Sequence, residues 1–279
     1  MKLFLLLASL ALANAGVPFE PIDVNYHETI GIPMAERIKQ AEMAQDFDGG
    51  RIIGGSQSNL GNHPHLGGLV VTLTNGRQSM CGSSLLTNTR VLTAAHCWRT
   101  LGMQGRSVVV VLGSLTLFSG GTRVTSTNVQ LHANYNMNNL QNDIAIIVIP
   151  WSTLLRNNIR NIGLASGSNA FVGANAVAAG YGLTADCTTG RLRHVTLQVI
   201  TNAECARTYG SVIIASTICT SSASNRNVCQ GDSGGSLVAD RTIAYIGVTS
   251  FVARRGCQAG LPAGFARVTS FNSWIRARL

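Results

Sequence analysis

The chain has 279 residues, of which 46% are hydrophobic, and a formal net charge of +9. This length allows one large hydrophobic core or two smaller ones. The basic residues are scattered and no nucleic-acid-binding motif accompanies them, so the charge does not indicate a nucleic-acid-binding protein. After the N-terminus, no segment has about 20 consecutive apolar residues, so we expect no later transmembrane helix.

The first 15 residues have the pattern of a secretory signal peptide. Lys2 is followed by the apolar run LFLLLASLALANA, which is too short to span a bilayer and ends in small residues at Ala13 and Ala15. We expect cleavage after Ala15 and a secreted, extracellular protein, with a short membrane anchor as the alternative. In an exported chain, seven cysteines indicate disulfides with one cysteine left over.

The charge changes sign along the chain. Residues 1–51 carry seven acids and four bases, whereas residues 52–279 carry seventeen arginines, no lysine and five acids. Lysine loses its charge near pH ~10.4 and arginine does not, so an all-arginine surface suits an alkaline fluid. Compositional drift explains the same observation equally well.

Residues 16–51 form a candidate leader. Apolar residues at Ile32, Ala35, Ile38 and Ala41 have roughly helical spacing and predict a helix in IPMAERIKQAEMAQ. The DFDGGR that follows is acidic and glycine-rich, which is typical of a linker that a protease can reach.

From Ile52 onward, short β-branched segments such as HLGGLVVTL, SVVVVLG and DIAIIVI alternate with turn signals. This pattern predicts an all-β antiparallel barrel or sandwich. Only the C-terminal VTSFNSWIRARL predicts a further helix, with Phe271, Trp274 and Ile275 facing inward.

Ser233, in CQGDSGGSL, is the candidate nucleophile. A serine hydroxyl needs a base to remove its proton, and the oxyanion that it creates on the substrate needs backbone N–H donors. Gly231, Gly234 and Gly235 would let the chain turn sharply and present the N–H groups of Gly231 and Ser233. GDSGG also fits the nucleophile elbow of α/β-hydrolases, but that scheme needs a histidine after the serine, and none of the six histidines follows Ser233.

The base and its orienting acid must therefore lie upstream. His96, in VLTAAHCW, ends an apolar strand beside a cysteine and is the best candidate base. Asp143, in NNLQNDIAIIVI, heads an apolar strand and is expected to be buried, where a carboxylate needs a partner. We expect it to hold the imidazole tautomer and to stabilise its charge.

TAAHC, NDIAIIVI and CQGDSGGSL, in the order His, Asp, Ser, resemble the chymotrypsin-like serine proteases, and RIIGG resembles their zymogen activation site. The resemblance covers residues 52–279, and the sequence is most similar to insect digestive chymotrypsins. It implies two six-stranded antiparallel β-barrels and a short C-terminal helix, with a serine endopeptidase site between the barrels. His96 would be the general base, Asp143 its orienter and Ser233 the nucleophile that forms an acyl-enzyme, and the N–H groups of Gly231 and Ser233 would form the oxyanion hole.

The resemblance also implies a zymogen. Its segments would be a signal peptide at 1–15, an activation propeptide at 16–51 and a peptidase domain at 52–279, whose barrels divide near 155–165. Cleavage after Arg51 would create an amine at Ile52 that pairs with Asp232, and a buried Asp232 does need a cation. The implied disulfides are Cys81–Cys97, Cys205–Cys219 and Cys229–Cys257. Cys187 is left over as a candidate free thiol.

The resemblance places Asn227 at the floor of the specificity pocket and lets Ser250 to Val252 pair with the substrate. Asn227 carries no charge, so a basic substrate side chain would be desolvated without an ion partner. Val252 and Ala263 stand where glycines would leave the pocket open, so large aromatic side chains fit less well than Leu or Met. A chymotrypsin-like preference for apolar residues is favoured, and an elastase-like preference for small apolar residues is the alternative.

We expect protein and peptide substrates, an activating trypsin-like protease and protein protease inhibitors as partners. We expect no nucleic acid, membrane, metal or cofactor to bind, and we expect a monomer that acts in digestion in the gut lumen. A non-catalytic homologue is the remaining alternative, but such proteins usually lack a member of the triad, and all three are present here.

Overall fold

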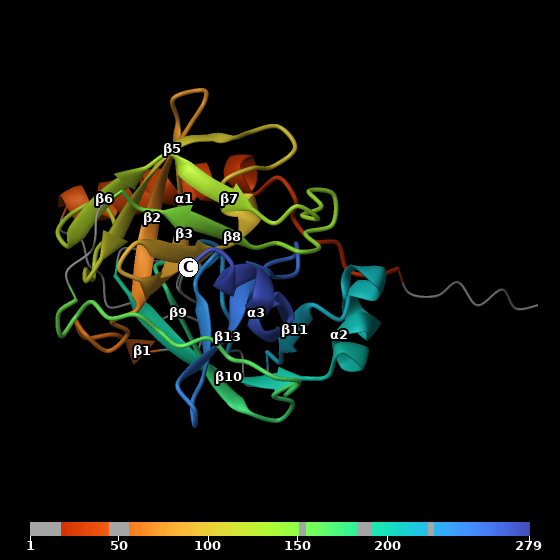
Figure 1. Ribbon diagram of the computed structural model, residues 1–279. Helices are drawn as coiled ribbons and strands as arrows, with labels where there is room; N and C mark the ends of the chain where they lie inside the picture. The colour runs from red at the N-terminus through yellow and green to blue at the C-terminus, as the bar shows by residue number, and fades with distance from the viewer. Residues whose placement is uncertain (1–17, 45–55, 151–154, 184–190, 223–225) are drawn as a thin grey trace, which may run out of the picture.

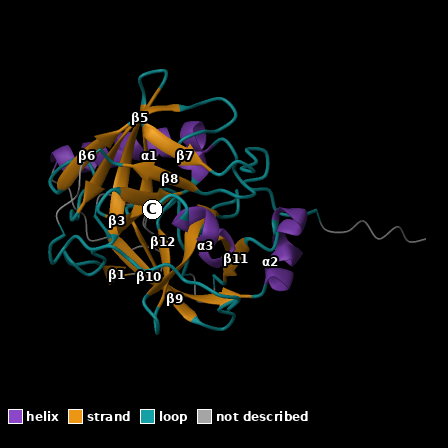
Figure 2. Cartoon of the chain, viewed as in Figure 1, coloured by secondary structure: helices purple, strands orange, loops and turns teal. Residues whose placement is uncertain are grey.

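The computed structural model describes residues 18–44, 56–150, 155–183, 191–222 and 226–279. The signal peptide, Arg51, Ile52 and Cys187 lie outside these ranges. The described chain forms two curled antiparallel sheets, one above the other in Figure 1, and strands predominate over helices (Figure 2). This confirms the expected all-β class.

The first sheet contains seven strands in the order β6-β5-β2-β3-β4-β8-β7. The strands are β2 (Leu66–Leu73), β3 (Gln78–Thr87), β4 (Arg90–Thr93), β5 (Gly105–Leu112), β6 (Thr122–Ser126), β7 (Asn128–Leu131) and β8 (Ala145–Val148). Only Thr127 separates β6 from β7, so one interrupted strand pairs with β5 on one side and with β8 on the other. The expected six-stranded barrel is therefore a curled seven-stranded sheet whose ends are joined through the chain.

The second sheet contains β1 (Ser56–Gln57), β9 (Asn175–Gly180), β10 (Arg193–Ile200), β11 (Thr217–Thr220), β12 (Ser236–Ala239), β13 (Ala244–Phe251) and β14 (Ala263–Arg267). Pairing of β9 with β10 closes the last six strands into a barrel, and β1 is added at the edge of β10. In β10, Val195, Leu197 and Val199 are buried and alternate with more exposed residues. This two-residue period is what a sheet with one face on a core requires.

Polar contacts hold the two barrels together. The Tyr181 hydroxyl donates to the Ser114 carbonyl at 2.8 Å, and a ring nitrogen of His65 lies 3.0 Å from the Ser236 hydroxyl. The backbone N–H of Gly82 donates to the Ser233 carbonyl at 2.6 Å. The loop that carries Ser233 is thus bonded directly to a strand of the first barrel.

Two helices agree with the sequence pattern. A short π-helical turn, η1 (His27–Gly31), leads into α1 (Ile32–Ala44), which lies against the first sheet (Figure 1). In α3 (Val268–Arg276), Phe271 and Ile275 are buried and Trp274 packs against the core beside them.

The sequence analysis missed α2 (Asn202–Tyr209). The Thr201 side chain caps this helix by accepting a hydrogen bond from the Glu204 N–H at 3.0 Å. A Thr followed three residues later by Glu is the signature of a capping box, so a signal was present. The eight-residue helix is too short for hydrophobic periodicity to be clear.

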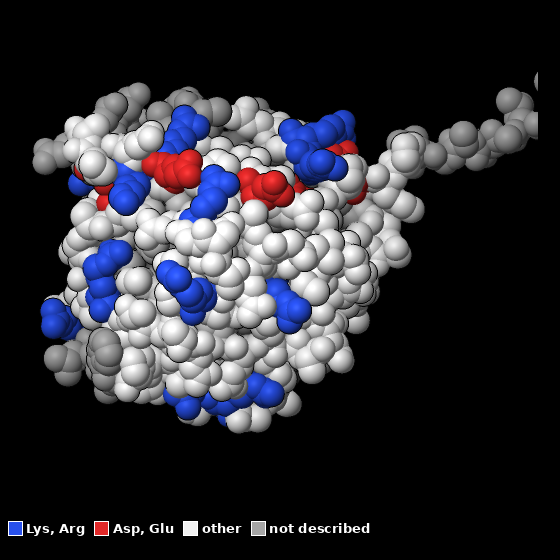
Figure 3. Space-filling view, turned by 90° about the horizontal axis from the view of Figure 1, so that it is seen from above, with Lys and Arg blue, Asp and Glu red and all other residues white. Residues whose placement is uncertain are grey.

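On the face in Figure 3, several basic side chains lie singly among uncharged residues, others gather at the upper right and at the lower edge, and acidic side chains lie between those along the top. No helix of the described segments is long and apolar enough to cross a membrane.

Replacing Thr201 by Ala should lower the free energy of unfolding by about 1 kcal/mol, because the Glu204 N–H loses its acceptor. Denaturant titration of the uncut chain measures this change. Thr201→Ser keeps the hydroxyl and is the matched control, so equal losses in both variants would show that the cap does not stabilise α2.

Candidate active site

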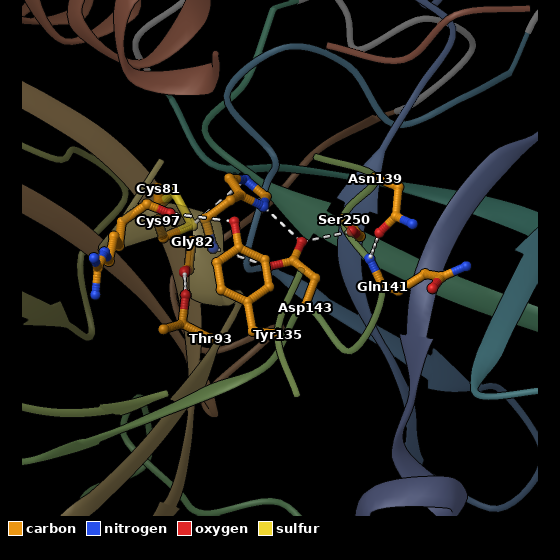
Figure 4. A network of polar contacts seen from close by, with 11 residues as sticks. Cys81, Gly82, Thr93, Cys97, Tyr135, Asn139, Gln141, Asp143 and Ser250 are labelled. Carbon is orange, nitrogen blue, oxygen red and sulfur yellow. Dashed lines mark hydrogen bonds and ion pairs between the residues drawn. A yellow bond between two sulfur atoms is a disulfide. The ribbon is translucent and has the colours of Figure 1, made fainter. Parts of the chain in front are cut away.

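His96 and Asp143 are brought together by the pairing of β4 with β8. Thr93 at the end of β4 pairs with Ala145 at the start of β8. His96 follows Thr93 in the 3-10 turn η2 (Ala95–Cys97), and Asp143 precedes Ala145, so both side chains lie at the same edge of the sheet. The Cys81–Cys97 disulfide ties this turn to β3 (Figure 4).

The Asp143 carboxylate is buried but well supplied with donors. One oxygen accepts the His96 backbone N–H at 2.9 Å, and the other lies 2.6 Å from His96 Nδ1 and 2.5 Å from the Ser250 hydroxyl. Figure 4 shows Ser250 approaching the carboxylate from the second barrel. Because Asp143 accepts at Nδ1, the proton of a neutral imidazole belongs on Nδ1, which leaves Nε2 as the basic nitrogen.

Ser233 lies in a tight turn that precedes β12. Gly231 and Gly234 have φ values of 96° and 79°, which disfavour any other residue. A Cβ on Gly234 would also lie 2.3 Å from the Thr93 hydroxyl and 2.4 Å from the Gly82 carbonyl oxygen. These glycines therefore allow the loop to reach the first barrel beside the turn that carries His96.

Asp232 is buried next to this loop. Its two oxygens accept the backbone N–H groups of Gly182 at 2.9 Å and Cys229 at 2.8 Å. Burial raises the pKa of Asp232 to about 6, and the two hydrogen bonds oppose this rise. A Cβ on Gly180 or Gly182 would lie 2.2 or 2.6 Å from Asp232 Oδ1, so the carboxylate occupies space that two missing side chains leave free.

The cavity beside Ser233 does not reach the floor of the expected specificity pocket. Ser250 and Val252 line it, whereas Asn227 and Ala263 are buried and do not. The Asn227 side-chain NH2 donates to the Leu261 carbonyl at 3.1 Å, and its oxygen has no partner among the described residues.

Leader residues complete the lining of this cavity. Asp23, Tyr26 and Ile30 lie on it together with His96 and Ser233. The ring of Tyr26 lies 4.6 Å from the ring of His96, centroid to centroid. The sequence analysis missed Tyr26, because no local pattern shows which surface a leader residue contacts.

The cysteine pairs implied by the resemblance are the pairs joined in the structure. The disulfides are Cys81–Cys97, Cys205–Cys219 and Cys229–Cys257. They brace the His96 turn, the segment between α2 and β11, and the loop that precedes Ser233.

The uncut chain should become less stable as pH rises through the range from about 4 to about 6. The pKa of Asp232 is about 6 in the folded chain and near 3.8 ordinarily, so the folded state holds the proton over this range and the unfolded state does not. Relative to Asp232→Asn, the parent should lose roughly 2–3 kcal/mol of unfolding free energy between pH 4 and pH 7. Both chains carry Arg51→Gln to keep them uncut, and parallel profiles in denaturant titrations would contradict the assignment.

Comparisons with known proteins agree with this geometry. The sequence profile of the Trypsin family matches residues 52–275. Collagenase from Hypoderma lineatum is 39% identical over 231 residues, which cover 81% of this chain and 86% of that protein. Brachyurin from Leptuca pugilator is 36% identical over 233 residues, which cover 81% of this chain and 98% of that protein. A solved structure of HL collagenase superposes with a TM-score of 0.76 at 38% identity, covering 81% of this chain and 98% of that one.

Proposed function

Because this chain belongs to the trypsin family of serine proteases, we propose that it is a secreted endopeptidase zymogen that is cut after Arg51 and then cleaves proteins after apolar residues. The observation that carries the proposal is the buried contact of 2.6 Å between His96 Nδ1 and Asp143, beside the Ser233 loop. We further propose that digestive fluid in the gut lumen is where it acts.

In the proposed reaction, the Ser233 hydroxyl attacks the scissile carbonyl carbon while its proton passes to His96 Nε2. Asp143 stabilises the imidazolium, and the N–H groups of Gly231 and Ser233 donate to the oxyanion. The imidazolium then gives the proton to the leaving amine, and an acyl-enzyme forms. Water, deprotonated by His96, releases the acid product and restores Ser233.

Asp232 supports the proposed activation step. Its two recorded donors are backbone N–H groups, and burial favours its protonated form. The new amine at Ile52 would supply the cation that a buried carboxylate needs, and this pairing would lower the pKa of Asp232. The same movement would reorganise the neighbouring turn at Gly231 and Ser233, which holds the proposed oxyanion donors.

Replacing Arg51 by Gln should give an intact chain with no more than background activity after exposure to trypsin, because no amine forms at Ile52. Arg51→Lys keeps a trypsin site and should activate normally. Intact mass and hydrolysis of a peptide substrate, read on the same samples, test this step, and full activity of the uncut Gln variant would exclude it.

The proposed preference for apolar substrates rests on the positions that the family resemblance gives to Asn227, Val252 and Ala263, because Asn227 and Ala263 do not line the cavity of the uncut chain. A panel of peptide anilides ending in Phe, Tyr, Leu, Met, Ala, Val or Arg should show kcat/KM highest for an apolar residue and roughly 100-fold or more lower for Arg. Asn227→Asp should raise the Arg value, since it adds an ion partner, and Ser233→Ala should abolish all cleavage. The Ala and Val substrates decide the elastase-like alternative, and rapid cleavage after Arg by the parent would refute the pocket assignment.

A further inference from the structure

The leader enters the site just beyond Ser250 to Val252, the segment expected to pair with substrate. Ile22 forms an antiparallel bridge with Ala253, and the Arg254 N–H donates to the Pro21 carbonyl at 3.0 Å. The Glu20 carboxylate lies 2.8 Å from the Arg255 guanidinium. The leader thus makes an isolated antiparallel bridge just past the end of β13, a short version of the pairing by which proteins bind extended peptides.

The leader then turns sharply at the catalytic residues. Asp23 accepts the Asn25 N–H at 2.9 Å, and the Asn25 carbonyl accepts the N–H groups of Glu28 and Thr29 at 3.0 and 3.1 Å. The chain that passes the site is therefore folded into a turn and a helix. A scissile bond must lie in an extended peptide to pair with the strand and reach Ser233, and this segment is not extended.

Tyr26 blocks the catalytic pair. Its side chain is 3% exposed, its ring lies against His96, and its hydroxyl donates to the Met80 carbonyl at 2.8 Å. Burial raises the pKa of Tyr26, and an interaction with the Ser233 side chain opposes this rise. Within the described segments, His96 Nε2 lies 3.8 Å from Cys97 Sγ and forms no hydrogen bond with the Ser233 hydroxyl.

The helix behind Tyr26 anchors the leader on the first barrel. Ile38 is fully buried, and the Met34 methyl group lies 3.3 Å from where a Cβ on Gly231 would be. The Glu42 carboxylate accepts the backbone N–H groups of Leu117 and Phe118 at 2.5 and 2.9 Å. Apolar burial at Met34 and Ile38 and the hydrogen bonds that Glu42 accepts thus hold α1 against the rest of the structure.

We propose that residues 18–44 have a second function, as a tethered inhibitor that occupies the catalytic cleft and remains bound after the chain is cut at Arg51. The proposal rests on the proposed protease function. All seven cysteines lie after residue 80, so no disulfide retains the leader once it is cut. Activation then takes two steps, which are cleavage and release of the leader, and the free leader remains able to bind a second copy of the protease domain.

The test uses the full chain with a cleavage site for factor Xa, which is more selective than trypsin. Asp48→Ile with Gly49→Glu turns residues 48–51 into Ile-Glu-Gly-Arg, which factor Xa cuts to leave Ile52 as the new N-terminus. After complete cleavage, size-exclusion chromatography with mass spectrometry shows whether the leader stays bound. Labelling of Ser233 by a fluorophosphonate and hydrolysis of a peptide anilide are then followed over time at several dilutions.

We expect the cut leader to co-elute with the protease domain at high concentration, with slow labelling and a lag in hydrolysis that shortens on dilution. Tyr26→Ala should weaken retention of the leader by roughly 100-fold, because it truncates a buried aromatic side chain, and should remove the lag. Glu36→Ala removes an exposed ion pair between α1 and Arg77. Because an exposed ion pair contributes little, this variant is the matched control and should keep the lag.

A leader that separates at once, with full labelling and hydrolysis from the first measurement in the parent as in Tyr26→Ala, would overturn the inhibitor and leave the protease function intact. An absence of labelling and hydrolysis in every cut form, even after the leader has been removed, would overturn both. The dilution series on the parent decides the matter even if Tyr26→Ala fails to fold.

Discussion

The buried carboxylate of Asp143 sets the central constraint on this structure. A charge removed from water must be surrounded by donors, and its donors come from different parts of the chain. His96 follows β4 in the first barrel and supplies two of them, whereas Ser250 lies in β13 of the second barrel. The two barrels must therefore meet in one arrangement. Contacts such as that between Tyr181 and Ser114 fix this arrangement away from the site.

Features with a local or periodic signal could be predicted, and features that depend on distant contacts could not. The all-β class and the burial of Asp143 agree with such signals, and the Cys81–Cys97 pair agrees with the family resemblance. The break between β6 and β7 leaves no clear mark, because the same β-branched composition runs through it. The position of Tyr26 against His96 joins residues 70 positions apart, and only the shape of the folded cleft brings them into contact.

Two features of the uncut chain affect the proposed nucleophile Ser233 in different ways. The buried Asp232 carboxylate accepts the N–H groups of Cys229, in its own loop, and of Gly182, which follows β9, so its charge state affects where the N–H groups of that loop point. The leader instead acts on access, by placing an aromatic ring between imidazole and solvent. One feature depends on electrostatics inside the second barrel and the other on packing of the leader, and the two meet where Met34 lies beside Gly231.

The space around Asp232 also limits how this protein can evolve. Gly180 and Gly182 leave room for the carboxylate, and even an alanine at either position would overlap Oδ1. Any residue larger than glycine at either position would therefore displace the Asp232 carboxylate, whatever the substrate. New specificities must arise farther from the carboxylate, at positions such as Val252, where a side chain borders the cavity and can change size without displacing a buried charge.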